Sequence, residues 1–408
     1  MRIAFLTVSA EMGGSERSLI ELLRALRSLR PDWTFDVVLP REGPLAVQVR
    51  DGGATPVFLP MPPALSRFGE SGRGNIGNRG AALPSAIAAA AGYARELRRL
   101  LQSLGTDVIH SNGLKHHVLA AWSRARRTPL VWHIHEYVTP RPLSRTLLRR
   151  SAGRVDVAVA NSRSVARDLA FAVGRDLRIE TIYNGIALVE FSPSRGAGDR
   201  ADVDALAGWA PAPAGTVRIG LVATFGRWKG HDVFLNALAR LDPALPIRAY
   251  IVGGAVYDTA GSQYSLEELR QMTSAAGLER RVAFTGFVPR TAPVLRALDI
   301  VVHASTQPEP FGLAIAEAMA CGCAVVVSDA GGAAEIVHAG ADALTHTPGD
   351  AEALSRALAQ LAGDAGLRAR LGGAARPAAV QKFDARAFAS GFAQVYESIA
   401  LARSGAAV

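Results

Sequence analysis

The chain has 408 residues, a formal net charge of +9 at pH 7, 49% apolar residues and 40 glycines. It exceeds the length of one ordinary domain, so we expect two domains of a compact α/β protein. No run of 18 apolar residues occurs, which excludes a transmembrane helix. Its two cysteines, Cys321 and Cys323, favour a reducing compartment and are expected to be small buried side chains.

The positive charge lies in the first half of the chain. Residues 1–192 carry 26 Lys and Arg against 16 Asp and Glu, whereas residues 193–408 carry 19 against 20. A basic first half favours contact with an anionic membrane face or an acidic substrate. A coding bias is the alternative, because only three lysines accompany the many arginines.

The first half alternates apolar strands with helices, which is typical of a parallel sheet. Residues 3–8 are interpreted as a first strand rather than a secretion signal, since two glycines and Glu16 follow closely. Ser15 is expected to cap the first helix. The expected strands are 3–8, 35–39, 56–59, 108–110, 129–133, 155–160 and 179–182. The expected helices are 15–30, 45–50, 86–104, 115–126, 143–152 and 164–171.

Residues 61–84 interrupt this alternation. They are rich in Pro, Gly and Arg, and we expect a mobile loop. The helix after it carries Arg95, Arg98 and Arg99 opposite an apolar face. The loop and helix together could dock on lipid, or the helix could simply pack on the sheet.

The second half repeats the alternation after a linker at 193–215. The expected strands are 217–223, 248–252, 282–284, 300–303, 324–327 and 344–345. The expected helices are 231–240, 266–276, 366–381 and 385–403, with others starting at residues 292, 313, 333 and 351. We therefore expect a first domain at 1–192, a second at 216–384, and a terminal segment at 385–408.

The most informative motif is Pro308-Glu309-Pro310-Phe311-Gly312, followed by a helix starting at Leu313. Two prolines stiffen the backbone around Glu309, and Gly312 permits a tight turn. The free N–H groups of a helix N-terminus bind anions. Glu309 and Glu317 would accept hydrogen bonds from hydroxyls of a ligand that also carries phosphates. A capped helix with an acidic first turn is the alternative.

Four other loops follow expected strands, where a parallel sheet binds its ligands. Gly13 and Gly14 would let backbone N–H groups approach a phosphate. His135 would hydrogen-bond a hydroxyl or handle a proton, unless it is structural. Lys229 and Arg227 would neutralise a diphosphate, unless they form a solvated basic turn. Gly331 and Gly332 open another helix suited to phosphate.

In their order and spacing these motifs resemble glycosyltransferase family 4, whose members are retaining nucleotide-sugar enzymes of the GT-B fold. The resemblance covers nearly the whole chain, is strongest over 217–337 and weakest over 61–99. It implies two Rossmann-like domains facing each other across a cleft, with a C-terminal helix that crosses back to the first. Thr224 departs from the family pattern, which usually places an arginine five residues before Lys229; Arg227 would substitute.

The resemblance also implies a role for each motif. Glu309 would hold the sugar hydroxyls, Glu317 the ribose, and Lys229 with Arg227 the departing diphosphate, while His135 would contact the sugar. Gly13 and Gly14 would approach the diphosphate. The remaining donor-binding positions implied are Phe311, Gly312, Leu313, Gly286, Phe287, Val288, Gly331 and Gly332.

The expected activity is transfer of a sugar from a nucleoside-diphosphate sugar to a lipid-linked or saccharide hydroxyl, without a metal or other cofactor. A nucleotide-sugar-binding inactive paralogue and a nucleotide-sugar epimerase are the alternatives. A dinucleotide oxidoreductase is disfavoured, because neither first strand is followed by Gly-x-Gly-x-x-Gly. The expected location is cytoplasmic, at the inner membrane face if the basic half binds lipid, with no nucleic-acid partner. The sequence does not indicate an oligomeric state.

Overall fold

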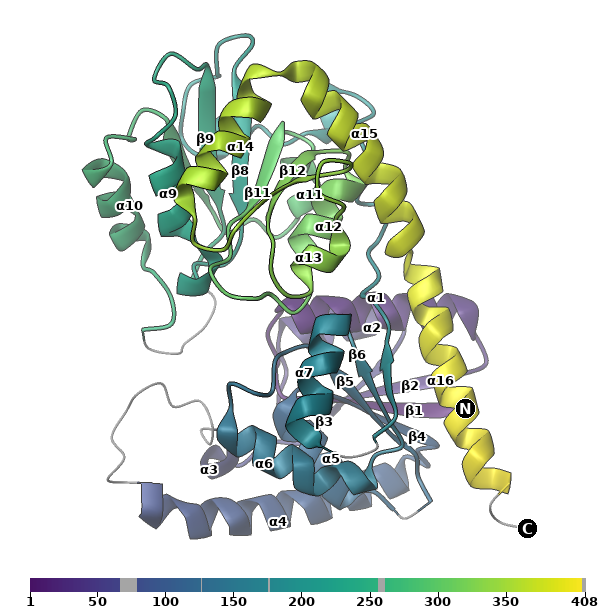
Figure 1. The fold of residues 1–408 in the computed structure, drawn as a ribbon. Helices are drawn as coiled ribbons and strands as arrows, with labels where there is room; N and C mark the ends of the chain where they lie inside the picture. The colour runs from purple at the N-terminus through teal and green to yellow at the C-terminus, as the bar shows by residue number, and fades with distance from the viewer. Residues whose placement is uncertain (67–78, 126, 175–176, 256–260, 406–408) are drawn as a thin grey trace. The chain divides into compact units, whose positions relative to one another are not determined.

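The computed structural model describes the chain except for residues 67–78, 126, 175–176, 256–260 and 406–408. It forms two α/β units (Figure 1). The first comprises Met1–Gly185 together with the C-terminal helix α16 (Ala385–Gly405), and the second is Ile186–Asp384. Residues 67–78 of the expected loop at 61–84 lie outside the described residues.

The first unit is built on a parallel seven-stranded sheet in the order β3-β2-β1-β4-β5-β6-β7. Its strands are β1 (Arg2–Thr7), β2 (Thr34–Leu39), β3 (Thr55–Phe58), β4 (Val108–Asn112), β5 (Leu130–Ile134), β6 (Val157–Ala160) and β7 (Ile179–Thr181). Its other helices are α1 (Gly14–Leu29), α2 (Pro44–Asp51), α3 (Pro63–Ser66), α4 (Arg79–Ser103), α5 (Leu114–Ser123), α6 (Pro142–Ser151), the 3-10 turn η2 (Ala152–Arg154) and α7 (Arg163–Val173).

Both faces of this sheet are covered, because successive side chains of a strand point to opposite faces. In β1, Ile3 and Phe5 pack into one core with α1, α2 and α16. Ala4 and Leu6 pack into the other core, which is closed by α4, α5, α6 and α7. Helix α16 lies against α1, so the expectation that the last helix joins the first unit is confirmed.

The second unit is built on a parallel six-stranded sheet in the order β10-β9-β8-β11-β12-β13. Its strands are β8 (Val217–Val222), β9 (Ile247–Val252), β10 (Val282–Gly286), β11 (Ile300–His303), β12 (Ala324–Ser328) and β13 (Leu344–His346). Its helices are η3 (Ala197–Asp199), α8 (Val203–Leu206), η4 (Arg227–Lys229), α9 (His231–Leu238), α10 (Leu266–Ala275), α11 (Thr291–Leu295), α12 (Leu313–Ala320), α13 (Ala333–Ile336), α14 (Ala351–Gly363) and α15 (Ala365–Lys382).

The expected loop at 61–84 is wrong at both ends. Helix α3 occupies Pro63–Ser66, and α4 begins at Arg79 rather than at residue 86. The expectation treated Pro84 as the end of the loop. Alanine and leucine surround this proline in the sequence, and their helix propensity outweighs the cost of one proline near the helix start.

A buried ionic network fixes the segment that leads into β8. The Asp204 carboxylate accepts hydrogen bonds from the Tyr250 hydroxyl at 2.5 Å, Arg248 at 2.6 Å, Arg218 at 3.1 Å and the backbone N–H of Ala212 at 3.0 Å. Burial alone would raise the pKa of Asp204, but these four donors outweigh it and lower the pKa well below its usual value. The segment before β8 is thereby tied to β8 and β9.

Replacing Asp204 by Asn should destabilise the second unit by about 3 kcal/mol, because the partly buried guanidinium groups of Arg218 and Arg248 lose their buried counter-charge. Because the folded pKa of Asp204 is lowered, its stabilisation is complete above the unfolded value of about 4 and is lost as pH falls below it. The stability difference between wild type and D204N should therefore shrink below about pH 4. Urea midpoints across pH measure this. The exposed-pair control Glu352→Gln should change stability by under about 1 kcal/mol, and equal effects of the two variants would refute the assignment.

Candidate active site

The loops that carry the predicted site of the second unit all follow the carboxyl ends of parallel strands. Strand β8 pairs with β9 on one side and with β11 on the other, so the strand order reverses at β8. Open parallel sheets bind ligands at such a reversal, beyond the carboxyl ends of the strands. Lys229 follows β8 and Glu309 follows β11, which places both residues at this point.

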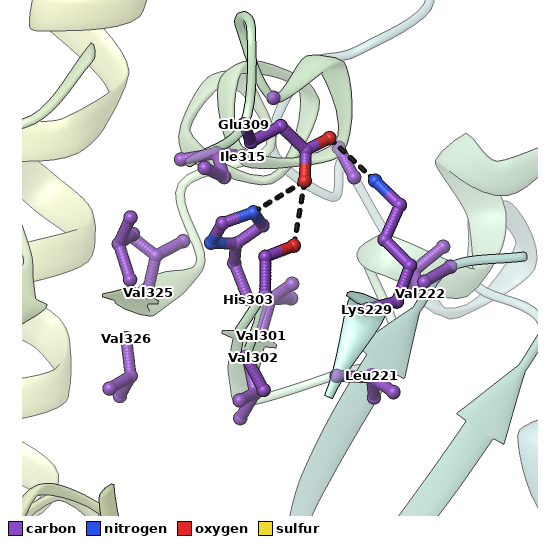
Figure 2. Close-up of a pocket in the computed structure, with 16 residues that line it drawn as sticks. Leu221, Val222, Lys229, Val301, Val302, His303, Glu309, Ile315, Val325 and Val326 are labelled. Atoms are coloured by element: carbon purple, nitrogen blue, oxygen red, sulfur yellow. Dashed lines mark hydrogen bonds and ion pairs between the residues drawn. The ribbon is translucent and has the colours of Figure 1, made fainter. Parts of the chain in front are cut away.

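The structure brings Glu309 and Lys229 into direct contact (Figure 2). Lys229 Nζ lies 2.5 Å from Glu309 Oε1. The other carboxylate oxygen, Oε2, lies 2.9 Å from His303 Nε2 and 2.7 Å from Ser305 Oγ. A small pocket beneath this cluster is lined by apolar side chains that include Leu221 and Ile315.

The protonation state of this cluster follows from its contacts. Burial alone would raise the pKa of Glu309, but the charge of Lys229 and the hydrogen bonds from His303 and Lys229 hold that pKa well below its usual range. The carboxylate is therefore ionised and can only accept hydrogen bonds. It follows that His303 Nε2 carries a hydrogen and donates a hydrogen bond to Glu309 Oε2. Two donors occupy Oε2, so Oε1 is the oxygen that a ligand hydroxyl would reach once Lys229 moves to another anion.

Backbone contacts hold the Lys229 loop against the loop that leads to Glu309. The Thr306 N–H donates to the Trp228 carbonyl at 2.8 Å. Gly230 has φ +72°, and a Cβ there would lie 1.9 Å from the Ala304 carbonyl oxygen. Only glycine fits this close approach. The Lys229–Glu309 distance is thus set by paired backbone segments as well as by the ion pair.

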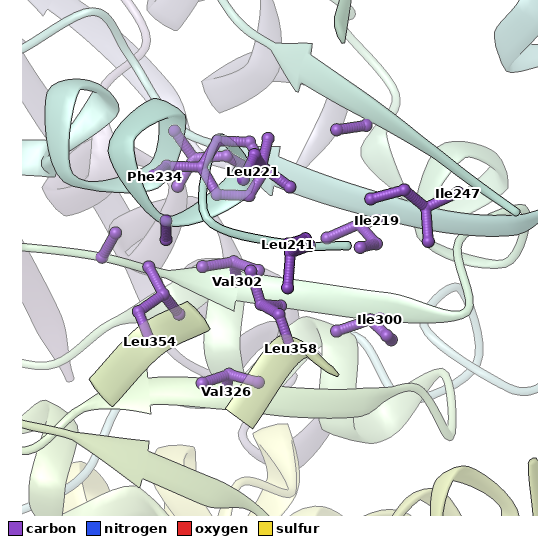
Figure 3. Close-up of a cluster of buried hydrophobic side chains, with 14 of the residues drawn as sticks. Ile219, Leu221, Phe234, Leu241, Ile247, Ile300, Val302, Val326, Leu354 and Leu358 are labelled. Carbon is purple, nitrogen blue, oxygen red and sulfur yellow. The ribbon is translucent and has the colours of Figure 1, made fainter. Parts of the chain in front are cut away.

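The sheet beneath the site is anchored by the core of the second unit (Figure 3). Leu221 of β8 and Val302 of β11 are buried there, next to α9 and α14. Full burial of such a side chain contributes about 1.5–3 kcal/mol. The strands that lead to Lys229 and end at His303 are therefore held by a buried core.

Gly312 is the N-cap of α12 and has a conformation that favours glycine. Its φ is +101°, and a Cβ there would lie 2.7 Å from Ile315 Cδ1. Leu313 is the first residue of α12. The Phe311 ring is buried and packs edge-on against Phe383, with 5.6 Å between ring centroids. A donor contact at Phe311 would therefore come from its backbone.

Glu317 lies on α12 with 3% of its surface exposed. It is not among the residues that line the pocket beneath Glu309. Its assignment as the ribose ligand stays a prediction.

The structure does bring the Gly331-Gly332 segment to Glu309. The Gly332 N–H donates to the Glu309 carbonyl at 2.7 Å, and Gly331 pairs with Glu309 in a parallel bridge. Gly331 has φ +68°. These two predicted motifs, 22 residues apart in the chain, therefore form one loop cluster.

The segment Gly286-Phe287-Val288 begins with the last residue of β10, at the same sheet edge. Gly286 has φ +73°, and the Phe287 side chain is 64% exposed. An exposed phenyl ring beside the strand ends offers a face on which a base could stack. The role of these residues toward a nucleotide stays a prediction.

Arg227 is not part of the Glu309 cluster. Its guanidinium pairs with Glu268 at 2.6 Å and lies over the Tyr264 ring, 4.3 Å from the centroid. The Arg227 side chain would have to leave Glu268 to reach a diphosphate beside Lys229. Lys229 is therefore the better-placed cation of the two.

In the first unit, His135 follows β5 in a cluster of buried histidines. Its ring lies 3.9 Å from that of His133, centroid to centroid. Burial lowers the pKa of His135 to about 3, so the imidazole is neutral near pH 7. Its Nε2 has no hydrogen-bond partner among the described residues. That nitrogen is buried, so the contact of His135 with a sugar hydroxyl stays a prediction.

The Gly13-Gly14 loop differs in detail from the expectation. Gly13, not Ser15, is the N-cap of α1, and the side chain of Glu16 turns back to accept the Gly13 N–H at 3.2 Å. Ser15 Oγ also donates to Glu16, at 2.9 Å. Burial raises the pKa of Glu16. The expected Ser15 cap is wrong because the buried Glu16 carboxylate takes up the N–H at the start of the helix.

Sequence reasoning missed His303 and Ser305 as residues of the site. His303 ends an apolar strand and was interpreted only as its last residue. A signal was present in the sequence, since a histidine and a serine lie six and four residues before Glu309, on the loop that leads to it.

The described residues contain no group of three His, Cys, Asp or Glu placed to hold a metal ion.

Two family models match the chain. Residues 12–190 match the family described as Glycosyltransferase Family 4, and residues 216–364 match the family described as Glycosyl transferases group 1. The two matches leave only the connecting segment and the chain ends uncovered.

Curated relatives carry out glycosyl transfer. The chain is 32% identical to the D-inositol 3-phosphate glycosyltransferase of Nocardia farcinica, over 65% of this chain and 61% of that protein. It is 31% identical to the enzyme of the same name from Xylanimonas cellulosilytica, over 67% of each chain. It is also 31% identical to a GDP-mannose-dependent phosphatidylinositol monomannoside mannosyltransferase of Mycolicibacterium smegmatis, over 63% and 66%. The alignment spans about six tenths of the length of the Nocardia relative.

A solved structure matches nearly the whole chain. The Anabaena protein HepE in complex with UDP-glucose superposes with a TM-score of 0.79 and 28% identity, covering 98% of this chain and 100% of that one. HepE has also been solved with UDP alone, at 26% identity and the same TM-score.

Proposed function

Because the chain belongs to glycosyltransferase family 4, we propose that it transfers a sugar, with retention of anomeric configuration, from a nucleoside-diphosphate sugar to a hydroxyl acceptor. Its two parallel-sheet units are those of the GT-B fold that the sequence implied. The acceptor would be lipid-linked or a saccharide, in the synthesis of a glycolipid, polysaccharide or other glycoconjugate.

One observation carries this proposal: an ionised carboxylate and a lysine meet where the strand order of the second sheet reverses. In the donor complex Lys229 would exchange Glu309 for the diphosphate, whose charge grows as it departs. Glu309 Oε1 would then be open to the hydroxyls of the sugar, while His303 and Ser305 keep Oε2 in place. Hydrogen bonds to a charged group are stronger than those between neutral groups.

The proposed reaction breaks the bond between the sugar carbon C1 and the phosphate oxygen, and forms a bond from C1 to the acceptor oxygen. The acceptor proton passes to the departing phosphate oxygen, on the same face of the sugar. No side chain acts as a covalent nucleophile in this scheme, and Glu309 is engaged by three donors. Activity without a metal ion is part of the proposal.

The ligands named for similar proteins indicate which nucleotides to test first as part of the donor. HepE binds UDP-glucose, and the Mycolicibacterium relative depends on GDP-mannose. We therefore expect uridine or guanosine diphosphate to raise the Tm of this protein. A ligand at about 100 times its Kd stabilises by about 2.7 kcal/mol, which corresponds to roughly 5–10 °C for a unit of this size.

The experiment is a thermal-shift panel of nucleoside diphosphates, their sugars and matched nucleoside monophosphates. The diphosphates should shift the Tm more than the monophosphates, because Lys229 and the helix N-termini would face the phosphates. Release of sugar from the best donor, measured next, separates a transferase from a protein that only binds the donor. A panel in which no diphosphate shifts the Tm would refute donor binding.

A further inference from the structure

Four arginines of the first unit, on one helix and the 3-10 turn that follows it, carry positive charge that no carboxylate pairs with in the described part of the chain. Arg145, Arg149 and Arg150 lie on α6, and Arg154 lies on the 3-10 turn η2 that continues it. None of the four pairs with a carboxylate among the residues that the structure describes. All but the partly covered Arg145 are exposed.

The carboxylates of the same helical layer are committed elsewhere. Asp168 on α7 accepts the backbone N–H groups of Val138 and Thr139, at 2.6 and 3.2 Å. Asp156 accepts the Leu130 N–H at 2.8 Å and pairs with Arg124 at 3.0 Å. Both carboxylates therefore already accept hydrogen bonds from groups other than the α6 arginines.

Exposed apolar side chains lie on both sides of these arginines. Trp122 of α5 is 47% exposed, and the Arg154 guanidinium lies 3.9 Å from its ring centroid. Phe171 of α7 is 68% exposed, with Arg145 at 5.2 Å from its ring centroid. Leu143, in the first turn of α6, is 48% exposed.

These groups form one continuous surface. Trp122 Nε1 donates to Ser151 Oγ at the end of α6, at 3.0 Å, which joins α5 to α6. The Arg145–Phe171 contact joins α6 to α7. Helices α5, α6 and α7 are neighbours on the same face of the first sheet (Figure 1). We call the four arginines with Trp122 and Phe171 the α6 surface.

We propose that the α6 surface docks on an anionic lipid bilayer. Arginines next to the lipid headgroups each gain about a fivefold preference for the membrane, and exposed aromatic and leucine side chains partition into its interfacial region. A soluble polyanion would match the arginines but would leave the exposed Phe171 and Leu143 unused. No helix in the described part of the chain is long and apolar enough to cross a bilayer, so the contact is peripheral.

This inference adds a partner to the proposed function, because a lipid-linked acceptor would be met at the membrane surface. It differs from the expectation based on residues 61–104, because the exposed aromatic side chains lie on α5 and α7 and the unpaired charge on α6 and η2. The contact does not use the donor site, so the two proposals can fail separately.

The test is co-sedimentation of the full chain with phosphatidylcholine vesicles that do or do not contain phosphatidylglycerol. Binding should require phosphatidylglycerol and fade as salt rises, since salt screens exposed charges. The triple variant Arg145→Gln, Arg149→Gln, Arg150→Gln should lower partitioning on the order of 100-fold or more. Phe171→Ser, which keeps the net charge, should lower it several-fold.

The matched control removes the same charge from the second unit, through Arg240→Gln, Arg270→Gln and Arg280→Gln, all at exposed positions. This variant should bind vesicles nearly as wild type does. Equal losses in both triple variants would overturn the proposal in favour of net charge alone, and so would absence of binding to anionic vesicles. Tighter binding to heparin or single-stranded DNA, dependent on the arginines but not on Phe171, would also overturn it. The nucleotide-induced Tm shift of each variant checks its fold and its donor site independently.

Discussion

Replacing Glu309 by Gln should lower the turnover number for sugar transfer on the order of 10³-fold. A carboxylate that accepts two sugar hydroxyls contributes about 1.5–3 kcal/mol through each bond, and each 1.36 kcal/mol is tenfold in rate. The amide loses the negative charge beside the reacting carbon. It also meets three donors, His303, Ser305 and Lys229, with only one acceptor oxygen.

Nucleotide affinity should behave differently from turnover in this variant. In the free protein Lys229 is held by Glu309, so a diphosphate has to compete with this carboxylate for the lysine. E309Q removes the competitor, and the Kd for the nucleoside diphosphate should be equal to or lower than that of wild type. Initial rates at saturating donor and calorimetric titration with the diphosphate measure the two quantities.

The control for this variant is Glu352→Gln, which removes an exposed carboxylate on α14 of the same unit. It should leave both quantities unchanged. If E309Q retained wild-type turnover, Glu309 would have no role in transfer and the site would have to lie elsewhere. A loss of diphosphate binding equal to the loss of turnover would instead indicate a structural role for Glu309.

The strands and most helices could be predicted because burial in a parallel sheet demands continuous apolar runs. Apolar runs such as 217–223 and 324–327 predict strands, and each observed strand differs from the predicted range by one residue at one end. The predicted start of α4 is too late, because the prediction gave more weight to a proline in a glycine-rich segment than to the helix propensity of the alanines around it. Local sequence does not state which of two opposing propensities prevails.

The meeting of Lys229 and Glu309 could be anticipated, since both follow expected parallel strands whose carboxyl ends share one edge. The partners of Arg227 could not, because Glu268 lies 41 residues further along the chain on an exposed helix. His303 was missed because a histidine at the end of an apolar run gives no sign of which way its ring points. Contacts set by backbone pairing follow from topology, whereas contacts set by side-chain rotamers require coordinates.

Replacing Lys229 by Ala should lower donor cleavage about 10²- to 10³-fold, because one preformed donor toward a developing negative charge has an effect of this size. The same change should alter the pH dependence of the remaining activity. Burial raises the pKa of Glu309 and the charge of Lys229 lowers it, so removing Lys229 raises that pKa. Glu309 acts as the ionised form, so the residual rate of K229A should increase as pH rises through the new pKa of Glu309. The rate of the wild type should not change with pH over the same range.

Two further variants determine whether this effect belongs to the site. Arg227→Ala removes a cation two residues away whose guanidinium is engaged by Glu268, so its effect on donor cleavage should be much smaller than that of K229A. Lys382→Ala removes a lysine of the same unit that hydrogen-bonds the Ile336 carbonyl at 3.2 Å and should leave the rate unchanged.

If R227A proved as damaging as K229A, the guanidinium must leave Glu268 when the donor binds, and both cations would share the diphosphate. If K229A kept the wild-type rate and pH profile, the ion pair with Glu309 would be a feature of the fold alone, because a lysine that neutralises the leaving group cannot be removed without slowing its departure.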